Sequence, residues 1–253
     1  MLQKYKMTIV YDGTSYSGWQ IQPNAVTIQE ILQNTLEVIL RSKISVIGAG
    51  RTDAGVHALG QVAHFQHAEE IDLYRFLASV NGVLPKNIRV TEVEPVPPSF
   101  HARYSAVNKR YHYHLSLGRV QDPFKRLYSW HISEKLDLDL LQECTQLFLG
   151  THDFTSFANE AKLGAASKKP VRTLKKLNIV PERTGIRLEF ESESFLYKMV
   201  RNITGTLVEV ARGKRDIKDV PKILEAKDRR KADRAAPPQG LFLMGVDYGT
   251  VQK

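Results

Sequence analysis

A short glycine-rich segment carries the side chains of this chain that are best suited to chemistry. The sequence GAGRTDAGVHA, residues 48–58, contains three glycines, one arginine and a single acid, Asp53. Glycine lets a ligand come close to the backbone, and an arginine two residues before an aspartate can hold that carboxylate ionised and oriented. Because binding and catalytic groups concentrate in such loops, the pattern favours a functional site at Asp53 and Arg51 over a structural turn with a surface ion pair.

A lone carboxylate beside an arginine fits some reactions better than others. It suits nucleophilic or single-residue acid/base catalysis rather than a hydrolase with two carboxylates. The sequence contains no GxxxxGK[ST] loop, no GxGxxG after its first strand and no GxSxG, so it offers no motif for nucleotide binding or serine hydrolysis.

Four histidines near other polar residues call for an interpretation. His57 and His64 flank the glycine-rich segment, where a hydrogen-bonding or packing role is more typical than general-base catalysis. His112 and His114 lie two residues apart on a predicted strand with basic neighbours. We interpret this second pair as exposed strand residues rather than as zinc ligands.

Excess positive charge predicts a polyanionic partner. The chain has 36 Lys and Arg against 27 Asp and Glu, a net charge of +9. This excess favours nucleic acid, with an anionic membrane surface as the second candidate. The basic residues cluster in the C-terminal half, which favours RNA or DNA over a merely solvated face. The clusters are Lys168, Lys169, Arg172, Lys175 and Lys176; Lys198 and Arg201; Arg212, Lys214 and Arg215; and Lys227, Arg229, Arg230, Lys231 and Arg234.

Cysteine usage and hydropathy indicate a cytoplasmic protein. The one cysteine, Cys144, lies among apolar residues and is expected in the core. A single cysteine excludes an intramolecular disulfide and fits a reducing compartment. No stretch reaches the roughly 18 apolar residues of a membrane span, and the N-terminal residues are typical of a strand rather than of a secretory leader.

The periodicity of apolar residues predicts an α+β protein with two similar halves. In the first half the order is β-α-β-β-α-β, with helices beginning after Thr27, which forms a capping box with Glu30, and after Asp72. The predicted strands there are residues 5–11, 44–47, 60–66 and 88–93. The second half repeats the order, with strands at 108–117, 171–180, 186–191 and 241–248, and helices at 138–148, 199–210 and from 216.

Two such units in tandem predict two ferredoxin-like halves. The proline-rich segment before Tyr104 suggests a boundary, giving an N-terminal half, 1–104, with the Asp53 loop and a basic, RNA-binding half, 105–253. If the two sheets join edge to edge, their open faces form a central catalytic cleft into which the Asp53 loop projects. Tyr111 could then stack on a nucleobase, although a core position fits its strand equally well, and Arg201 could pair with a carboxylate or phosphate.

Several separate motifs over nearly the whole chain resemble the TruA type of tRNA pseudouridine synthase. The catalytic motif of that family is similar to GAGRTDAGVHALGQVAHF, residues 48–65. The others are YDGTSYSGWQIQPNAVTIQ at 11–29, FHARYSAVNKRYHYH at 100–114, SFLYKMVRNITGTL at 194–207 and APPQGLFLMGVDY at 236–248. One departure precedes the last motif, where family members usually show a glycine and a threonine and this chain has Asp233 and Ala235.

The resemblance implies an activity and a role for four residues. It assigns Asp53 as the nucleophile, Arg51 as the residue that orients it, Tyr111 as the aromatic group stacked on the target base and Arg201 as a second basic group. It also implies isomerisation of uridine to pseudouridine at positions 38–40 of the tRNA anticodon stem-loop by a homodimer, with no cofactor and no metal. Two alternatives stay open: a non-catalytic RNA-binding protein on the same scaffold, and a small-molecule enzyme, which leaves the basic C-terminal half unexplained.

Overall fold

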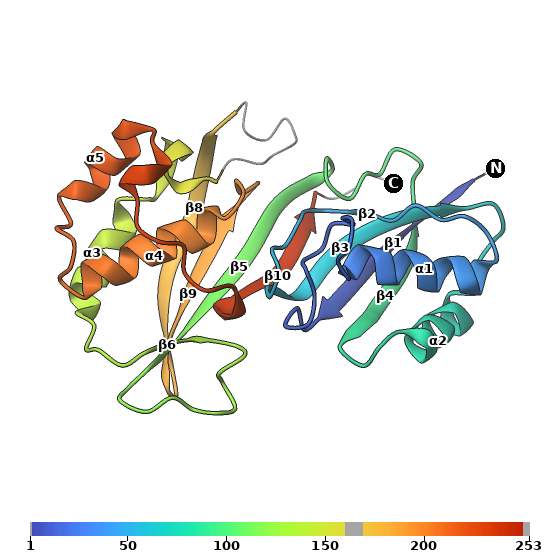
Figure 1. Ribbon diagram of the computed structural model, residues 1–253. Helices are drawn as coiled ribbons and strands as arrows, with labels where there is room; N and C mark the ends of the chain where they lie inside the picture. The colour runs from blue at the N-terminus through green and yellow to red at the C-terminus, as the bar shows by residue number, and fades with distance from the viewer. Residues whose placement is uncertain (1, 160–168, 250–253) are drawn as a thin grey trace. The chain divides into compact units, whose positions relative to one another are not determined.

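The computed structural model describes residues 2–159 and 169–249, and the chain divides into two compact units (Figure 1). Unit 1 comprises Met1–Lys109 and Phe242–Lys253, and unit 2 comprises Arg110–Leu241. The sequence led us to expect a division after residue 104 with the C-terminal strand in the second half. The structure differs at the C-terminus because the last strand, β10 (Leu241–Tyr248), pairs in parallel with a strand of unit 1.

Unit 1 has the predicted order β-α-β-β-α-β. Its strands are β1 (Gln3–Tyr11), β2 (Ile47–Gly48), β3 (His57–His67) and β4 (Ile88–Val96), and its helices are α1 (Ile28–Leu40) and α2 (Leu73–Val83). Strand β1 lies between β3 and β4 and is antiparallel to both, so that Met7 is opposite Ala63 on one side and Val93 on the other. Strand β10 adds to β3 on the far side, with Phe242 opposite His57.

Both helices of unit 1 begin at the predicted caps. The hydroxyl of Thr27 accepts a hydrogen bond from the backbone N–H of Glu30, and the carboxylate of Asp72 accepts one from Arg75. These bonds satisfy N–H groups that the first helical turn leaves without partners. Figure 1 shows α1 and α2 on the same side of β1, β3 and β4. The helices bury apolar stripes that include Leu32 and Leu36 on α1, and Phe76 and Val80 on α2.

Unit 2 has the order β-α-β-β-α with additions, and the final strand of the predicted pattern, β10, lies in unit 1 from Phe242. Its strands are β5 (Ala106–Leu117, which enters the unit at Arg110), β6 (Trp130–Ile132), β7 (Gly150–Asp153), β8 (Val171–Glu182) and β9 (Gly185–Ser192). The order is β5-β9-β8-β7, with β6 added to β5. The helices are α3 (Leu138–Gln146), α4 (Met199–Ala211) and α5 (Asp219–Ala226). The short strands β6 and β7 were not predicted, since three or four residues give almost no periodic signal.

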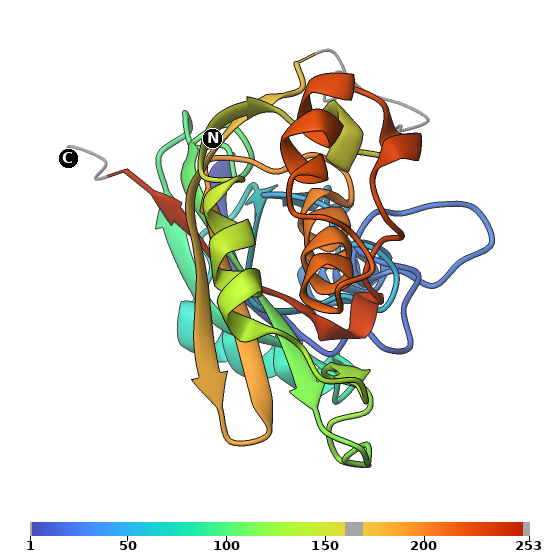
Figure 2. The ribbon, with the colours of Figure 1, turned by 90° about the vertical axis from the view of Figure 1, so that its left-hand side faces the viewer.

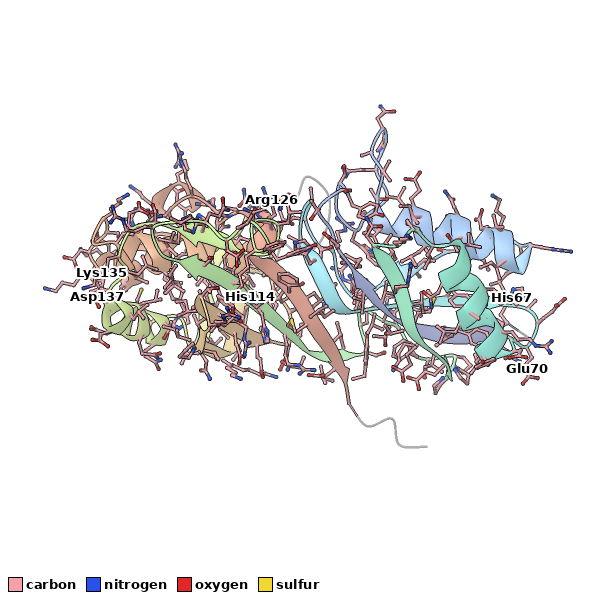
Figure 3. All side chains as sticks on the ribbon, turned by 90° about the horizontal axis from the view of Figure 1, so that it is seen from below. His67, Glu70, His114, Arg126, Lys135 and Asp137 are labelled. Atoms are coloured by element: carbon pink, nitrogen blue, oxygen red, sulfur yellow. The ribbon has the colours of Figure 1, made fainter. Side chains whose placement is uncertain are left out.

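Helix α4 forms the centre of unit 2. Its buried residues include Met199, Ile203, Leu207 and Val210, as the sequence predicted. Figure 2 shows α3 and α4 next to each other beside β8 and β9. Asp137 lies at the start of α3 (Figure 3), where its carboxylate accepts a hydrogen bond from the N–H of Leu140. No helix in residues 2–159 and 169–249 is long and apolar enough to cross a membrane.

The prediction that His112 and His114 are exposed is wrong. Both are partly buried on β5, with His112 Nε2 3.6 Å from a carboxylate oxygen of Glu189 and His114 Nδ1 3.1 Å from one of Glu182 (Figure 3 labels His114). Acidic residues of β8 and β9 therefore cover the two rings. Burial is the main cause that lowers the pKa of both histidines, that of His112 to about 4.

Candidate active site

The Asp53 loop, residues 49–56, connects β2 to β3 and is fixed mainly through Thr52. The carbonyl of Thr52 accepts a hydrogen bond from the N–H of Trp19 at 3.0 Å. Its hydroxyl is 2.7 Å from the hydroxyl of Tyr11, and both side chains are buried. Burial raises the pKa of Tyr11, so its phenol stays protonated and available for this bond. The residue directly before Asp53 is therefore anchored to the core of unit 1.

A tight turn fixes the other side of Asp53. The N–H of Val56 donates to the carbonyl of Asp53 at 3.1 Å, and Gly55 has φ +76. A positive φ at the third position is the signature of a type II turn, which favours glycine there. Val56 itself is buried. Anchors on both sides thus hold the backbone of Asp53 in one place.

Gly18 lets the preceding segment pack directly against the loop. It has φ +92, and a Cβ at this position would lie 2.6 Å from the carbonyl oxygen of Thr52 and 3.1 Å from the backbone of both Asp53 and Ala54. A side chain would therefore displace the loop. Although the segment around Gly18 was recognised in the sequence as a family motif, its contact with the Asp53 loop carries no signal in the pattern of residues.

The two predicted catalytic side chains differ in exposure. Asp53 is half-buried, whereas Arg51 is exposed and donates from Nε to the side-chain oxygen of Gln20 at 3.2 Å. Gln20 directly follows Trp19, which anchors Thr52. The same segment thus contacts the loop at two points, one through the backbone and one through Arg51.

Two buried histidines of β3, the strand that follows the loop, act as hydrogen-bonding and packing groups. His57 Nδ1 accepts from the N–H of Gly13 at 3.1 Å, and its ring stacks on Phe242 with centroids 4.6 Å apart. His64 Nδ1 accepts from the N–H of Ala102 at 3.1 Å. Burial, and then the charges of His101 and Lys4, lower the pKa of His64 to about 4. Its imidazole is therefore neutral near pH 7 and accepts this bond.

Sequence reasoning missed one cation beside the loop. Lys109 donates from Nζ to the carbonyl of Ala49 at 2.7 Å, and the same Nζ would be 3.3 Å from a Cβ on Gly50. Lys109 lies two residues before Tyr111 on β5. Residues two apart on a strand share a face, so the position of Tyr111 could have pointed to Lys109. The sequence contains no signal, however, that β5 lies beside the loop.

The two predicted substrate-binding residues belong to unit 2. Tyr111 is 8% exposed, and its ring meets that of Phe195 edge-on with centroids 5.1 Å apart. Arg201, in the first turns of α4, is half-buried and donates from Nε to the carbonyl of Ala236 at 2.8 Å. The structure thus places Asp53 and Arg51 on one loop of unit 1, and Tyr111 and Arg201 on β5 and α4 of unit 2.

The chain matches known proteins over most of its length. Residues 7–105 and 144–249 match the family described as tRNA pseudouridine synthase. The chain is 59% identical over 245 residues to tRNA pseudouridine synthase A 1 of Protochlamydia amoebophila, covering 96% of both chains. It is 44% identical to tRNA pseudouridine synthase A of Chlamydia muridarum, covering 98% of this chain and 93% of the relative. The corresponding protein of an Exiguobacterium strain is 41% identical over 250 residues, with coverage of 99% and 100%.

Proposed function

This chain belongs to the tRNA pseudouridine synthase family, and we propose that it isomerises uridine to pseudouridine at positions 38–40 of the tRNA anticodon stem-loop, with Asp53 as the nucleophile. The relatives carry the name of an isomerase that acts on tRNA, and they align over almost the full length of this chain. One observation supports the assignment to Asp53. Its backbone is anchored on both sides, while its side chain, the one carboxylate of the loop, is only half-buried.

The chemistry needs a group that breaks and remakes one bond without losing the base. Uridine and pseudouridine are isomers: the bond from N1 of uracil to C1′ of ribose breaks, a bond from C5 to C1′ forms, the C5 hydrogen leaves as a proton, and N1 gains a proton from solvent. A carboxylate can serve as the nucleophile that forms a covalent intermediate after the first bond breaks and before the second one forms. The target nucleotide must also leave its stack in the RNA for the glycosidic bond to be reached.

The other predicted residues have roles on the same uridine in this proposal. Arg51 orients Asp53, and the bond from its Nε to Gln20 leaves the other N–H groups of the guanidinium to contact the carboxylate. Tyr111 stacks on the uracil and keeps it in the pocket while it rotates, because a flat apolar ring holds a neutral base without fixing its orientation. Arg201 supplies a second positive charge for the carboxylate or a phosphate.

The partners follow from the substrate. A tRNA is a polyanion, and the net charge of +9 favours its binding. The inferred assembly is a homodimer whose basic faces grip the tRNA, and the inferred compartment is the cytoplasm, where tRNA is available.

Release of tritium from C5 tests the proposal. Full-length tRNA transcripts labelled at C5 of uridine and carrying a single uridine at position 38, 39 or 40 are incubated with the wild-type protein and with Asp53→Asn. The wild type is expected to release tritium, and the variant, which has nearly the same shape, to release it roughly 10³-fold more slowly or not at all. A wild type that binds the transcript without release would instead identify a non-catalytic RNA-binding protein.

A further inference from the structure

The segment between α5 and β10 lies against the backbone of α4. We define residues 228–237 as the strap. Arg229 of the strap donates to the side-chain oxygen of Asn202 on α4 and to the carbonyl of Asp233, both at 2.9 Å. At Gly205 of α4, a Cβ would lie 1.9 Å from the carbonyl oxygen of Arg234. The strap thus contacts the helix so closely that it requires glycine at this position.

The strap also forms hydrogen bonds with Arg201 and with Tyr113, a neighbour of Tyr111 on β5. Arg201 donates from Nε to the carbonyl of Ala236 at 2.8 Å, and the N–H of Ala236 donates back to the carbonyl of Arg201 at 2.9 Å. The hydroxyl of Tyr113 donates to the carbonyl of Pro237 at 2.7 Å. Tyr113 is two residues beyond Tyr111, on the same buried side of β5. The position of the strap therefore bears on both Arg201 and the strand that carries Tyr111.

One ion pair joins the strap to the segment that follows α4. Arg215 donates to Asp233 through two bonds, from Nε at 2.7 Å and from Nη2 at 2.8 Å. The exposed fractions of the two side chains are 25% and 15%. Paired bonds of this kind fix direction as well as distance. The hydrogen bonds and the charge of Asp233 outweigh desolvation and raise the pKa of Arg215, so the guanidinium stays charged.

The resemblance to the TruA type implies a glycine where this chain has Asp233. A glycine there would have no side chain to reach Arg215, so the ion pair depends on the aspartate of this chain. The strap connects Asp233 to Ala236, whose carbonyl and N–H are both bonded to Arg201.

We propose that Arg215 and Asp233 are positioning residues that hold the strap in register on α4, so that the Ala236 carbonyl fixes the guanidinium of Arg201 for substrate. The proposal rests on the proposed function. Without the pair the strap shifts relative to α4, Arg201 samples several orientations, and the chemical step slows while the fold persists on the apolar face of α4.

Two substitutions with opposite effects on charge test this role. Asp233→Asn makes the protein more positive, and Arg215→Gln makes it less positive, so an effect of charge on tRNA binding would change KM in opposite directions. Positioning predicts that both lower kcat, by about tenfold or more because a displacement of about 1 Å can cost 10²-fold. Asp139→Asn is the matched control: it removes the same charge from an exposed position in the first turn of α3, in the same unit, and is expected to leave kcat unchanged.

The double variant shows whether the two residues act as one unit. If they act only through each other, Asp233→Asn combined with Arg215→Gln lowers kcat no further than either change alone. Losses that multiply would overturn the proposal, because each residue would then act independently.

Hydrogen exchange at the Ala236 amide gives a readout that does not depend on activity. This amide is bonded to the Arg201 carbonyl, so Asp233→Asn is expected to speed its exchange about tenfold or more through local opening, and Asp139→Asn to leave it unchanged. Unchanged exchange, or faster exchange with unchanged kcat, overturns the proposal. If the wild type shows no isomerase activity, the proposed function fails, and the exchange rates still decide whether the pair holds the strap.

Discussion

Replacing Gly18 by alanine tests whether the Asp53 loop must be held in place for catalysis. The new Cβ would lie 2.6 Å from the carbonyl oxygen of Thr52, and since contacts of a Cβ below 3.0 Å essentially do not occur, the two must separate by at least 0.4 Å. The neighbouring backbone of Asp53 moves with Thr52. Gly18 touches neither substrate nor a catalytic side chain in the proposed mechanism, so any loss of rate arises from displacement of the loop.

Two magnitudes follow from this geometry. Forcing a non-glycine residue to φ +92 costs about 1–3 kcal/mol of stability, which a domain with a total of roughly 5–15 kcal/mol survives. A displacement of a few tenths of an ångström at the nucleophile is expected to lower kcat by roughly tenfold, since about 1 Å can cost 10²-fold. Tritium release at saturating tRNA measures kcat, and thermal unfolding measures the stability.

Gly82→Ala is the matched control. Nothing lies within 4 Å of a Cβ at Gly82, which is in α2. The change is expected to raise stability by about 0.5–1 kcal/mol and to leave kcat unchanged. Combining it with Gly18→Ala restores part of the lost stability, so that the loss of rate is measured on folded protein. If the combined variant has the wild-type kcat, the position of the loop does not limit the reaction and the reasoning is refuted.

Two further predictions concern an aromatic residue and two histidines. Tyr111→Phe is expected to retain most of the tritium release and Tyr111→Ala to lose most of it, because stacking needs the ring but not the hydroxyl; near-wild-type rates for both, with Tm lowered only for alanine, would make Tyr111 a core residue alone. Burial lowers the pKa of His64 and of His112 from 6.5 to about 4. Between pH 4 and pH 6.5 both histidines are therefore protonated in the unfolded chain and neutral in the folded protein. Stability is therefore fully present above pH 6.5 and falls as the pH is lowered toward 4. His64→Asn, whose Oδ1 can accept the same N–H, should flatten the dependence of Tm on pH in that window, and an unchanged slope would contradict the assignment.

Local patterns in the sequence predicted much of unit 1. The capping residues Thr27 and Asp72 gave the starts of both helices, because a cap is satisfied by bonds within a few residues. Alternation placed Tyr5, Met7, Ile9 and Tyr11 on the buried face of β1. The Asp53 loop was recognised from its glycines and its one acid, which are also local features.

Contacts between distant segments could not be predicted in the same way. The pairing of β10 with β3, which assigns the C-terminal strand to unit 1, joins residues about 185 positions apart, and no periodicity encodes such a partner. The contact of Gly18 with the loop and the bonds between the strap and α4 are of the same kind. His112 and His114 were misjudged because the strand pattern shows which residues share a face, but not that acidic neighbours cover it.

The central claim is that Asp53 is the nucleophile of a tRNA uridine isomerase. The most direct measurement is the single-turnover rate of tritium release from C5-labelled tRNA for the wild type, Asp53→Asn and Asp53→Ala, with tRNA binding measured in parallel. The account predicts release by the wild type, a loss of roughly 10³-fold or more in both variants, and tRNA affinity that is retained in the asparagine variant. Release at the wild-type rate by either variant would contradict it.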